Sequence, residues 1–213
     1  TNDNKVILSG TIDRNLSVGE YIRVSLDGGV SYLRATVNPD GKGWTLNLTS
    51  NTLLDGTYTI KAQIVNQFGT PGAEHERELT VDTQVTEATI SIEGISTDTN
   101  IDNDFNTADN TLIFNGRVST ELAVDEFVEI SLDGGLTWRR ATVEGRNWTY
   151  DNTSEFLADK LDGYDVKVRV IDEAGNISGQ ASQNVIVNKE PPVGNVSVDP
   201  IATLDTTPTV TGS

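Results

Sequence analysis

The stretch Val128-Glu129-Ile130-Ser131-Leu132-Asp133-Gly134-Gly135 decides the fold of this 213-residue chain. Its apolar and polar residues alternate, and two glycines follow an aspartate. This pattern is typical of a β-strand that buries one face and ends in a tight turn. Nearly the same stretch, Ile22-Arg23-Val24-Ser25-Leu26-Asp27-Gly28-Gly29, stands 106 positions earlier. The chain therefore contains a strand-and-turn module that occurs twice.

The spacing of 106 residues extends well beyond this module. Further pairs repeat at this spacing or within two residues of it: Ala35-Thr36-Val37 and Ala141-Thr142-Val143, Trp44 and Trp148, Gly69 and Gly175, Val81 and Val187. An aspartate and a glycine seven residues apart occur three times, as Asp3 and Gly10, Asp109 and Gly116, and Asp205 and Gly212. A period of this length suits tandem independent domains, because helical repeats and propeller blades are much shorter.

Short alternating runs and frequent turn signals predict an all-β fold. Tyr164, Val166, Val168 and Val170 alternate with polar residues, and no helical periodicity is present. We expect an antiparallel sandwich of about seven or eight strands in each repeat, with Trp44 and Trp148 in the cores. The expected domains are a repeat at residues 1–82 that lacks its opening strand, a complete repeat at 83–189, and the beginning of a third repeat at 190–213.

Composition excludes several classes of function. The chain has 32 acidic and 15 basic residues and a formal net charge of −17, so nucleic acid and anionic membrane surfaces would repel it, whereas cations are natural partners. There is no cysteine and only one histidine, His75, which excludes disulfides, thiolate metal sites and multi-histidine zinc sites. No apolar stretch approaches the ~18 residues of a membrane span, so we expect no membrane insertion in this segment.

Residues 98–109 carry the strongest signal for a ligand. Oxygen-bearing side chains fall at loop positions 1, 3, 5, 7, 9 and 12, in the order Asp98, Asn100, Asp102, Asp104, Asn106 and Asp109. This spacing resembles the calcium loops of EF-hand and dockerin sites, in which alternate side chains turn toward one hard cation. Asn103 replaces the usual glycine at position 6, but asparagine tolerates the left-handed conformation. The sequence therefore predicts a Ca²⁺ site without flanking helices, and the alternative is a solvated acidic loop.

A second set of oxygen ligands is expected near a domain boundary. Asp172 and Asn176 lie in a turn that follows a strand, and Asp82 lies at the hinge between the first two repeats. Ordinary turn chemistry is the alternative interpretation. We expect Asp82 and the acidic loop to share an ion that locks the two repeats together. The junction after Asn188 is expected to lack such a loop and to be more flexible.

Four short motifs, spread over nearly the whole chain, suggest a family. In this sequence they are a variant of Leu-Asp-Gly-x-Tyr at 161–165, Asp172-x-x-Gly175-Asn176-x-Ser178, Val81-Asp82-Thr83, and Asp205-Thr206-Thr207-Pro208-Thr209-Val210-Thr211-Gly212. They resemble the bacterial immunoglobulin-like repeats of giant type I-secreted RTX adhesins, of the Bap and SiiE kind. The resemblance implies tandem immunoglobulin-like β-sandwiches in an extracellular stalk on the bacterial cell surface, stiffened by Ca²⁺ between neighbouring repeats.

The function implied by this resemblance is structural. The segment would extend an adhesin and support cell adhesion or biofilm formation, as a monomer. Its partners would be the neighbouring repeats of the same chain, and a distal domain would bind the surface ligand. The alternative is a glycan- or protein-binding module of a secreted protein, for which Tyr32, Trp138 and Tyr150 are the candidate aromatic contacts.

One motif has to be weighed against these interpretations. Ser131 to Trp138 matches the Asp-box, S-x-D-x-G-x-T-W, which is known from sialidase propellers. The Asp-box is a hairpin signature and not a catalytic motif, and the chain offers no arginine cluster with a tyrosine nucleophile. We therefore expect the protein not to be an enzyme.

Overall fold

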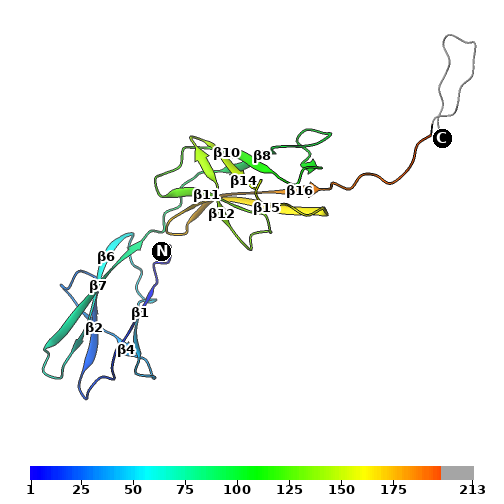
Figure 1. Ribbon diagram of the computed structural model, residues 1–213. Coiled ribbons are helices and arrows are strands. Elements are labelled where there is room, and N and C mark those ends of the chain that lie inside the picture. The colour runs from blue at the N-terminus through cyan, green and yellow to red at the C-terminus, as the bar shows by residue number, and fades with distance from the viewer. Residues whose placement is uncertain (198–213) are drawn as a thin grey trace, which may run out of the picture.

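The computed structural model describes residues 1–197, which form sixteen β-strands and no helix. The strands make two β-sandwiches that follow one another along the molecule (Figure 1). We call β1–β7 sandwich 1 and β8–β16 sandwich 2. The all-β prediction is confirmed.

Sandwich 1 consists of a three-stranded sheet and a four-stranded sheet. Its strands are β1 (Ile7–Thr11), β2 (Tyr21–Ser25), β3 (Leu33–Arg34), β4 (Thr36–Val37), β5 (Gly43–Asn47), β6 (Gly56–Val65) and β7 (Pro71–Val81). The strand orders are β1-β5-β4 and β3-β2-β6-β7, and all neighbours are antiparallel.

Sandwich 2 has the same plan with two additional strands. Its strands are β8 (Ile90–Ile95), β9 (Asn106–Thr107), β10 (Ile113–Val118), β11 (Glu126–Ser131), β12 (Arg139–Arg140), β13 (Thr142–Glu144), β14 (Asn147–Asp151), β15 (Lys160–Asp172) and β16 (Ile177–Val187). The orders are β13-β14-β10-β8 and β12-β11-β15-β16-β9. The short β9 is the exception to the antiparallel pattern, because it runs parallel to the end of β16.

Each sandwich packs a tryptophan of one strand against a glycine of the next. Gly10 lies opposite Trp44 and Gly116 lies opposite Trp148 in the strand register. A Cβ atom at Gly10 would approach the Trp44 indole to 2.6 Å, and one at Gly116 would approach the Trp148 indole to 2.8 Å. Side chains do not fit at such distances, so the repeated glycine has a packing reason. Trp148 is fully buried and Trp44 is 8% exposed, which confirms the expected core positions.

The repeated Asp-Gly-Gly stretch forms the turn that its composition predicts. Asp133 Oδ1 accepts hydrogen bonds from the main-chain amides of Leu136 and Thr137 at 3.0 and 2.9 Å. Gly134 and Gly135 have φ angles of 77° and 98°, a region that favours glycine. The Thr137 hydroxyl and amide are the main donors that hold the pKa of Asp133 well below its usual range. The Asp133 carboxylate therefore stabilises the turn.

The sandwiches differ at one edge. In sandwich 2, β8 pairs with β10 and completes the smaller sheet. The counterpart of β10 in sandwich 1 is β1, and no strand of residues 1–197 pairs with the corresponding side of β1. β1 is therefore an edge strand, whereas β10 is an inner strand.

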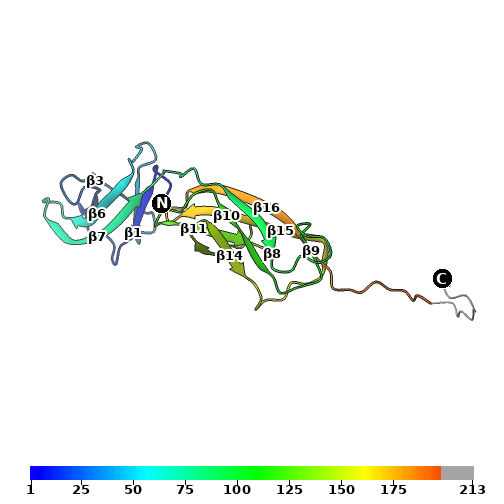
Figure 2. The ribbon, with the colours of Figure 1, turned by 90° about the horizontal axis from the view of Figure 1, so that it is seen from above.

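Residues 188–197 leave the far end of sandwich 2 and form no strand (Figure 2). Residues 190–197 of the expected third repeat form no strand, and the rest of that repeat, residues 198–213, lies outside the described residues. No helix that could cross a membrane occurs in residues 1–197.

Candidate metal centre

The acidic loop, residues 98–109, lies at the end of sandwich 2 where the chain leaves it. The loop connects β8 to β10, and its β9 segment pairs with Ile186 and Val187 at the end of β16. The main-chain amide of Asn188 donates to the carbonyl of Thr107 at 2.9 Å. The loop is therefore fixed beside the exit strand.

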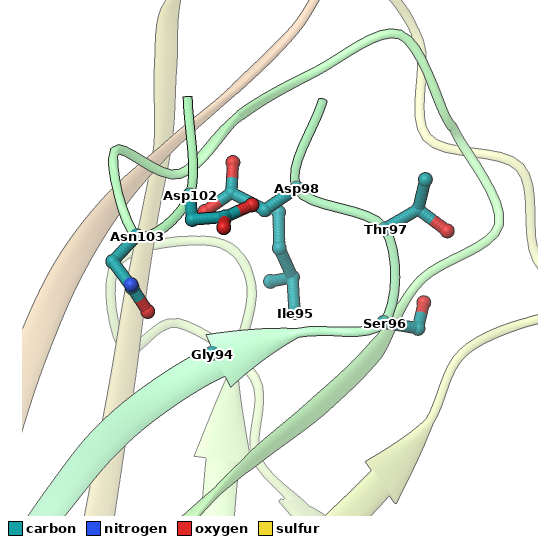
Figure 3. Close-up of a pocket in the computed structure, with 7 residues that line it drawn as sticks. All are labelled: Gly94, Ile95, Ser96, Thr97, Asp98, Asp102 and Asn103. Atoms are coloured by element: carbon teal, nitrogen blue, oxygen red, sulfur yellow. The ribbon is translucent and has the colours of Figure 1, made fainter. Parts of the chain in front are cut away.

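Two carboxylates of the loop share a pocket of about 520 Å³. Asp98 and Asp102 both line it, and their carboxylates lie next to each other in Figure 3. Asp98 Oδ2 accepts a hydrogen bond from the amide of Phe105 at 3.2 Å. Asp98 Oδ1 is buried and has no hydrogen-bond donor. A buried carboxylate oxygen without a donor is costly unless a cation or a water neutralises it, so the pocket has the chemistry of a cation site.

The loop backbone is unusual at three non-glycine positions. Asn100, Asn103 and Phe105 have φ angles of 75°, 66° and 59°. The left-handed conformation expected for Asn103 is therefore present. Phe105 is 7% exposed and belongs to the core cluster of sandwich 2. Burial of its ring offsets the strain of its backbone, because a positive φ is rare for a bulky residue.

Two further expected ligands of the loop, Asp104 and Asp109, accept hydrogen bonds from nearby amides and hydroxyls. Asp104 Oδ1 accepts from the amide of Asn106 at 2.9 Å, and this bond is the largest cause that lowers the pKa of Asp104. Asp109 Oδ1 accepts from the amide and the hydroxyl of Thr111, both at 2.8 Å. Within residues 1–197 no group of three or more Asp, Glu or His side chains is arranged as a metal site. The structure thus brings Asp98 and Asp102 together, whereas the Asp109 carboxylate binds Thr111.

The second expected group forms the junction between the sandwiches. Asn176 Nδ2 donates to Asp172 Oδ2 at 2.8 Å and to the main-chain carbonyl of Asp82 at 2.9 Å. Asp172 Oδ1 accepts from the amides of Gly175 and Asn176 at 2.7 and 2.8 Å. Burial would raise the pKa of Asp172, but the hydrogen bonds from Asn176 and Gly175 outweigh it and lower the pKa. Both carboxylate oxygens therefore have donors.

The expectation that Asp82 and the acidic loop share an ion is wrong. β8 runs from the linker at Asp82 along the length of sandwich 2, so the loop that follows it lies at the opposite end (Figure 1). The junction after Asn188, which was expected to lack an acidic loop, is the one beside this loop. The run Ala88-Thr89-Ile90-Ser91-Ile92 does predict a strand between Asp82 and Asp98, and the length of that strand separates the two groups.

Sequence reasoning missed several contacts of the junction. Asn2 Nδ2 donates to the carbonyl of Gly175 at 2.9 Å, and Asp55 Oδ1 accepts from the amide and hydroxyl of Thr83 at 3.0 and 2.9 Å. Asn2 corresponds to Ala108 in the repeat, so the repeat pattern offered no signal for it.

The three aromatic residues considered for glycan binding all have structural contacts. The guanidinium of Arg169 lies 4.0 Å from the ring of Trp138, whose indole N–H donates to the carbonyl of Gly135 at 3.1 Å. Arg23 lies over the ring of Tyr32 at 4.1 Å. Tyr150 packs against the core of sandwich 2. These contacts explain the three side chains without a bound sugar.

Comparison with known proteins supports the fold. No protein-family model matches the chain, and no curated protein matches it significantly. The fibronectin(III)-like modules of Clostridium thermocellum CbhA match over 86% of this chain and 85% of theirs, with 14% identity and a TM-score of 0.52. This similarity shows a fold of tandem β-sandwiches.

Two adhesin structures match with lower TM-scores. A Ca²⁺-stabilized adhesin of an ice-binding Antarctic bacterium matches over 92% of this chain and 47% of that one, with 22% identity and a TM-score of 0.36. The tetra-tandem repeat in the extending region of a large adhesion protein matches over 93% and 48%, with 22% identity and a TM-score of 0.31. The chain spans about half the length of these two structures.

Proposed function

We propose that the chain is an extender segment of a bacterial surface adhesin, whose role is to hold tandem sandwiches in series outside the cell. The observation that carries this proposal is the junction in which Asn176 of sandwich 2 binds the main chain of Asp82. Such a contact restrains the angle between neighbouring sandwiches, which is a mechanical role and not a chemical one. The adhesin-like sequence motifs and the fibronectin(III)-like fold support the same role.

The junction is anchored from both sandwiches. Asn2 reaches from sandwich 1 to Gly175 of sandwich 2, and Asp55 of sandwich 1 holds Thr83 of the linker. On the other side, the Thr86 hydroxyl donates to Glu126 of β11. These contacts support a repeat boundary near Asp82. In this proposal residues 83–189 are one complete unit that ends near Lys189, and residues 1–82 are a unit that lacks its opening strand.

Calcium in this proposal binds in the acidic-loop pocket. Asp98 and Asp102 would hold the ion, because Asp98 has a buried oxygen without a donor and lines the same pocket as a second carboxylate, and carboxylate oxygens are the ligands that Ca²⁺ prefers. Asp104 is the next proposed ligand, since it interacts with Asp98. Asn100, Asn106 and Asp109 would reach the ion only after the loop closes around it. The ion would neutralise the carboxylates and stiffen the exit beside Asn188.

The Asp82 junction needs no ion in this proposal. The amide nitrogen of Asn176 lies between the oxygens of Asp172 and Asp82, where a cation would otherwise bind. These three residues would act through hydrogen bonds. An ion at this place would require the side chain of Asn176 to turn its oxygen inward.

Distance measurements between the sandwiches test the proposed role. Val18 and Val124 occupy equivalent positions in the two repeats and are both almost fully exposed. The chain has no cysteine, so spin labels at Val18→Cys and Val124→Cys are the only labels in the protein. Electron–electron double resonance, with labelled chains diluted by unlabelled ones, should give one narrow distance distribution. A broad distribution would show freely swinging sandwiches and overturn the extender role.

A further inference from the structure

The larger sheet of sandwich 2 carries a row of charged side chains on its outer face. Arg140, Glu129 and Arg169 lie side by side on the neighbouring strands β12, β11 and β15. They point outward, because Val128 and Ile130, which flank Glu129 in its strand, are buried in the core. Glu129 Oε2 accepts hydrogen bonds from Nε and Nη2 of Arg169 at 2.9 and 2.6 Å. The row of sandwich 2 therefore contains its own carboxylate between two arginines.

Sandwich 1 carries different charges at the same positions. The residues 106 positions earlier are Arg34, Arg23 and Gln63, on β3, β2 and β6. Arg23 and Arg34 lie directly opposite each other, and like charges in this arrangement destabilise a sheet. Neither arginine forms an ion pair with any of residues 1–197. An arginine thus stands where sandwich 2 has its acid, and the row has no carboxylate between its strands β3 and β2.

Both guanidinium groups are held in place by aromatic rings. Arg23 lies over the ring of Tyr32 at 4.1 Å, and Arg34 lies over the ring of Tyr21 at 4.7 Å. Nη2 of Arg23 donates to Gln63 Oε1 at 3.1 Å, whereas its Nε is buried and has no acceptor. Stacked arginines have already lost part of their conformational freedom, so they lose less of it when an anion binds.

The acid on the next strand is already paired. Glu74 of β7 lies opposite Gln63 and binds the ammonium group of Lys61 at 2.8 Å. It also accepts a hydrogen bond from Gln63 Nε2 at 3.0 Å. The side chain of Gln63 therefore lies between this acid and Arg23. The paired charges of Arg23 and Arg34 are left without a carboxylate of the described chain.

We propose that Arg23 and Arg34 bind the carboxylate of an acidic sugar on the outer face of sandwich 1. A carboxylate is the group that Glu129 supplies at this place in sandwich 2, and planar guanidinium groups match its two oxygens. The net charge of −17 repels polyanions, which favours a glycan with isolated carboxylates among neutral groups. This inference does not depend on the proposed role in an adhesin.

The hydroxyl of Tyr21 favours a sugar over an acidic peptide as the source of the carboxylate. Tyr21 is partly exposed, its ring lies under Arg34, and its hydroxyl makes no hydrogen bond with the part of the chain that the structure describes. The hydroxyl groups of an acidic sugar are close to its carboxylate, so one ligand can bind the arginines and Tyr21 together. A glutamate side chain has only methylene groups at that distance. Tyr32 keeps its role as the support of Arg23.

NMR of the arginine side chains tests the site with methyl glucuronide as the probe. Arg23→Lys and Arg34→Lys identify the Nε–Hε signals of the two residues. Methyl glucuronide should shift both signals, and methyl glucoside, which lacks the carboxylate, should shift neither. N-acetylglutamate should bind about fivefold more weakly, because it lacks the sugar hydroxyls and loses one hydrogen bond. Tyr21→Phe should remove this difference between the two acids.

A charge exchange gives sandwich 1 the row of sandwich 2. Arg23→Glu with Gln63→Arg places an acid between two arginines, so it should abolish binding of methyl glucuronide. The melting temperature should not fall, because an opposite-charge pair replaces a like-charge pair. Arg34→Gln, a change at an exposed position, should weaken binding about tenfold. The matched control is Arg140→Gln, which removes the equivalent arginine of sandwich 2 and should leave binding unchanged.

Three results would overturn the inference. The Arg23 and Arg34 signals could stay unshifted in methyl glucuronide, or binding could survive the charge exchange in a folded chain. Equal affinities for methyl glucuronide and N-acetylglutamate would overturn the assignment to a sugar. If the charge-exchange variant does not fold, Arg34→Gln decides, and wild-type affinity in that variant would exclude the site.

Discussion

Asn176 and Asp82 are 94 positions apart in the sequence, and the side-chain amide of Asn176 donates a hydrogen bond of 2.9 Å to the main-chain carbonyl of Asp82. The same amide group binds the carboxylate of Asp172, so one side chain stabilises both a turn of sandwich 2 and the linker to sandwich 1. Every residue type has a main-chain carbonyl, so this contact with the linker does not depend on which side chain stands at position 82.

Replacing Asn176 should loosen the junction. Asn176→Ala removes the bond to Asp82 and leaves a largely buried carboxylate oxygen of Asp172 without its donor, at a cost of about 1–3 kcal/mol to sandwich 2. The distance distribution between spin labels at positions 18 and 124 should broaden. Thr70→Ala is the matched control, because Thr70 takes the same place in the turn of sandwich 1 and is exposed. An unchanged distribution in Asn176→Ala would show that other contacts hold the junction.

The depressed carboxyl pKa values predict acid lability. Hydrogen bonds lower the pKa of Asp133, and the pKa of Glu20 falls to about 2, chiefly through its bond to Arg14. A carboxyl group with a lower pKa in the folded state stabilises the fold above its unfolded pKa of ~4 and loses this effect as the pH falls. The melting temperature should therefore stay level near neutral pH and decrease below about pH 4.

A substitution isolates one of these groups. Asp133→Asn should lower the melting temperature at pH 7, because the neutral amide accepts weaker hydrogen bonds in the turn. It should lose less stability than the wild type between pH 5 and pH 2, since one titrating group is absent. Glu121→Gln is an exposed change in the same sandwich. It should have the wild-type melting temperature at pH 7 and lose as much stability as the wild type between pH 5 and pH 2. Parallel curves for Asp133→Asn and the wild type would contradict this account.

Much of the fold was predictable because it depends on local patterns. The alternation in Val128–Leu132 and the glycines that follow it specify a strand and a turn, and both are present. The repeat spacing placed Trp44 and Trp148 in equivalent core positions. It also indicated that residues 1–82 lack a strand equivalent to β8, and no strand of the described residues pairs with the side of β1 that faces away from β5.

The candidate site was less predictable because its geometry depends on long-range topology. Spacing within residues 98–109 suggested six inward-facing ligands, but local amides and hydroxyls bind Asp104 and Asp109. Nothing in the sequence showed that β9 pairs with the end of β16, and this pairing places the loop far from Asp82. The donor-free oxygen of Asp98 likewise follows from the packing of the whole loop.

Replacing the two core tryptophans should cost different amounts of unfolding free energy. Trp148 is fully buried and bonded to Ser91, so Trp148→Ala should cost about 3–5 kcal/mol of unfolding free energy. Trp44 is 8% exposed, lines a pocket beside the edge strand β1 and has no equivalent of that hydrogen bond among the described residues, so Trp44→Ala should cost less in its sandwich. Urea unfolding followed by circular dichroism gives both values. Equal losses would contradict the view that one side of the Trp44 indole lacks its covering strand.

Calcium should stabilise sandwich 2 and leave the Asp82 junction unchanged. An ion bound only by the folded state adds RT ln(1 + [L]/Kd), which is about 1.4 kcal/mol at ten times Kd. Sites in extracellular modules have Kd values of ~10⁻⁴–10⁻³ M, so ~10 mM Ca²⁺ should raise the melting temperature relative to EDTA, and Mg²⁺ should do so poorly. Asp98→Asn with Asp102→Asn should remove most of this gain.

The control for this pair is Asp125→Asn with Asp162→Asn, which changes the charge of sandwich 2 equally at two exposed positions outside the loop. It should keep the calcium response. Because the loop lies at the exit beside Asn188, Ca²⁺ should not alter the distance distribution between positions 18 and 124. A melting temperature that is the same in Ca²⁺ and EDTA would exclude the calcium site. A distribution that narrows in Ca²⁺ would instead place an ion at Asp82, Asp172 and Asn176, where the structure shows hydrogen bonds.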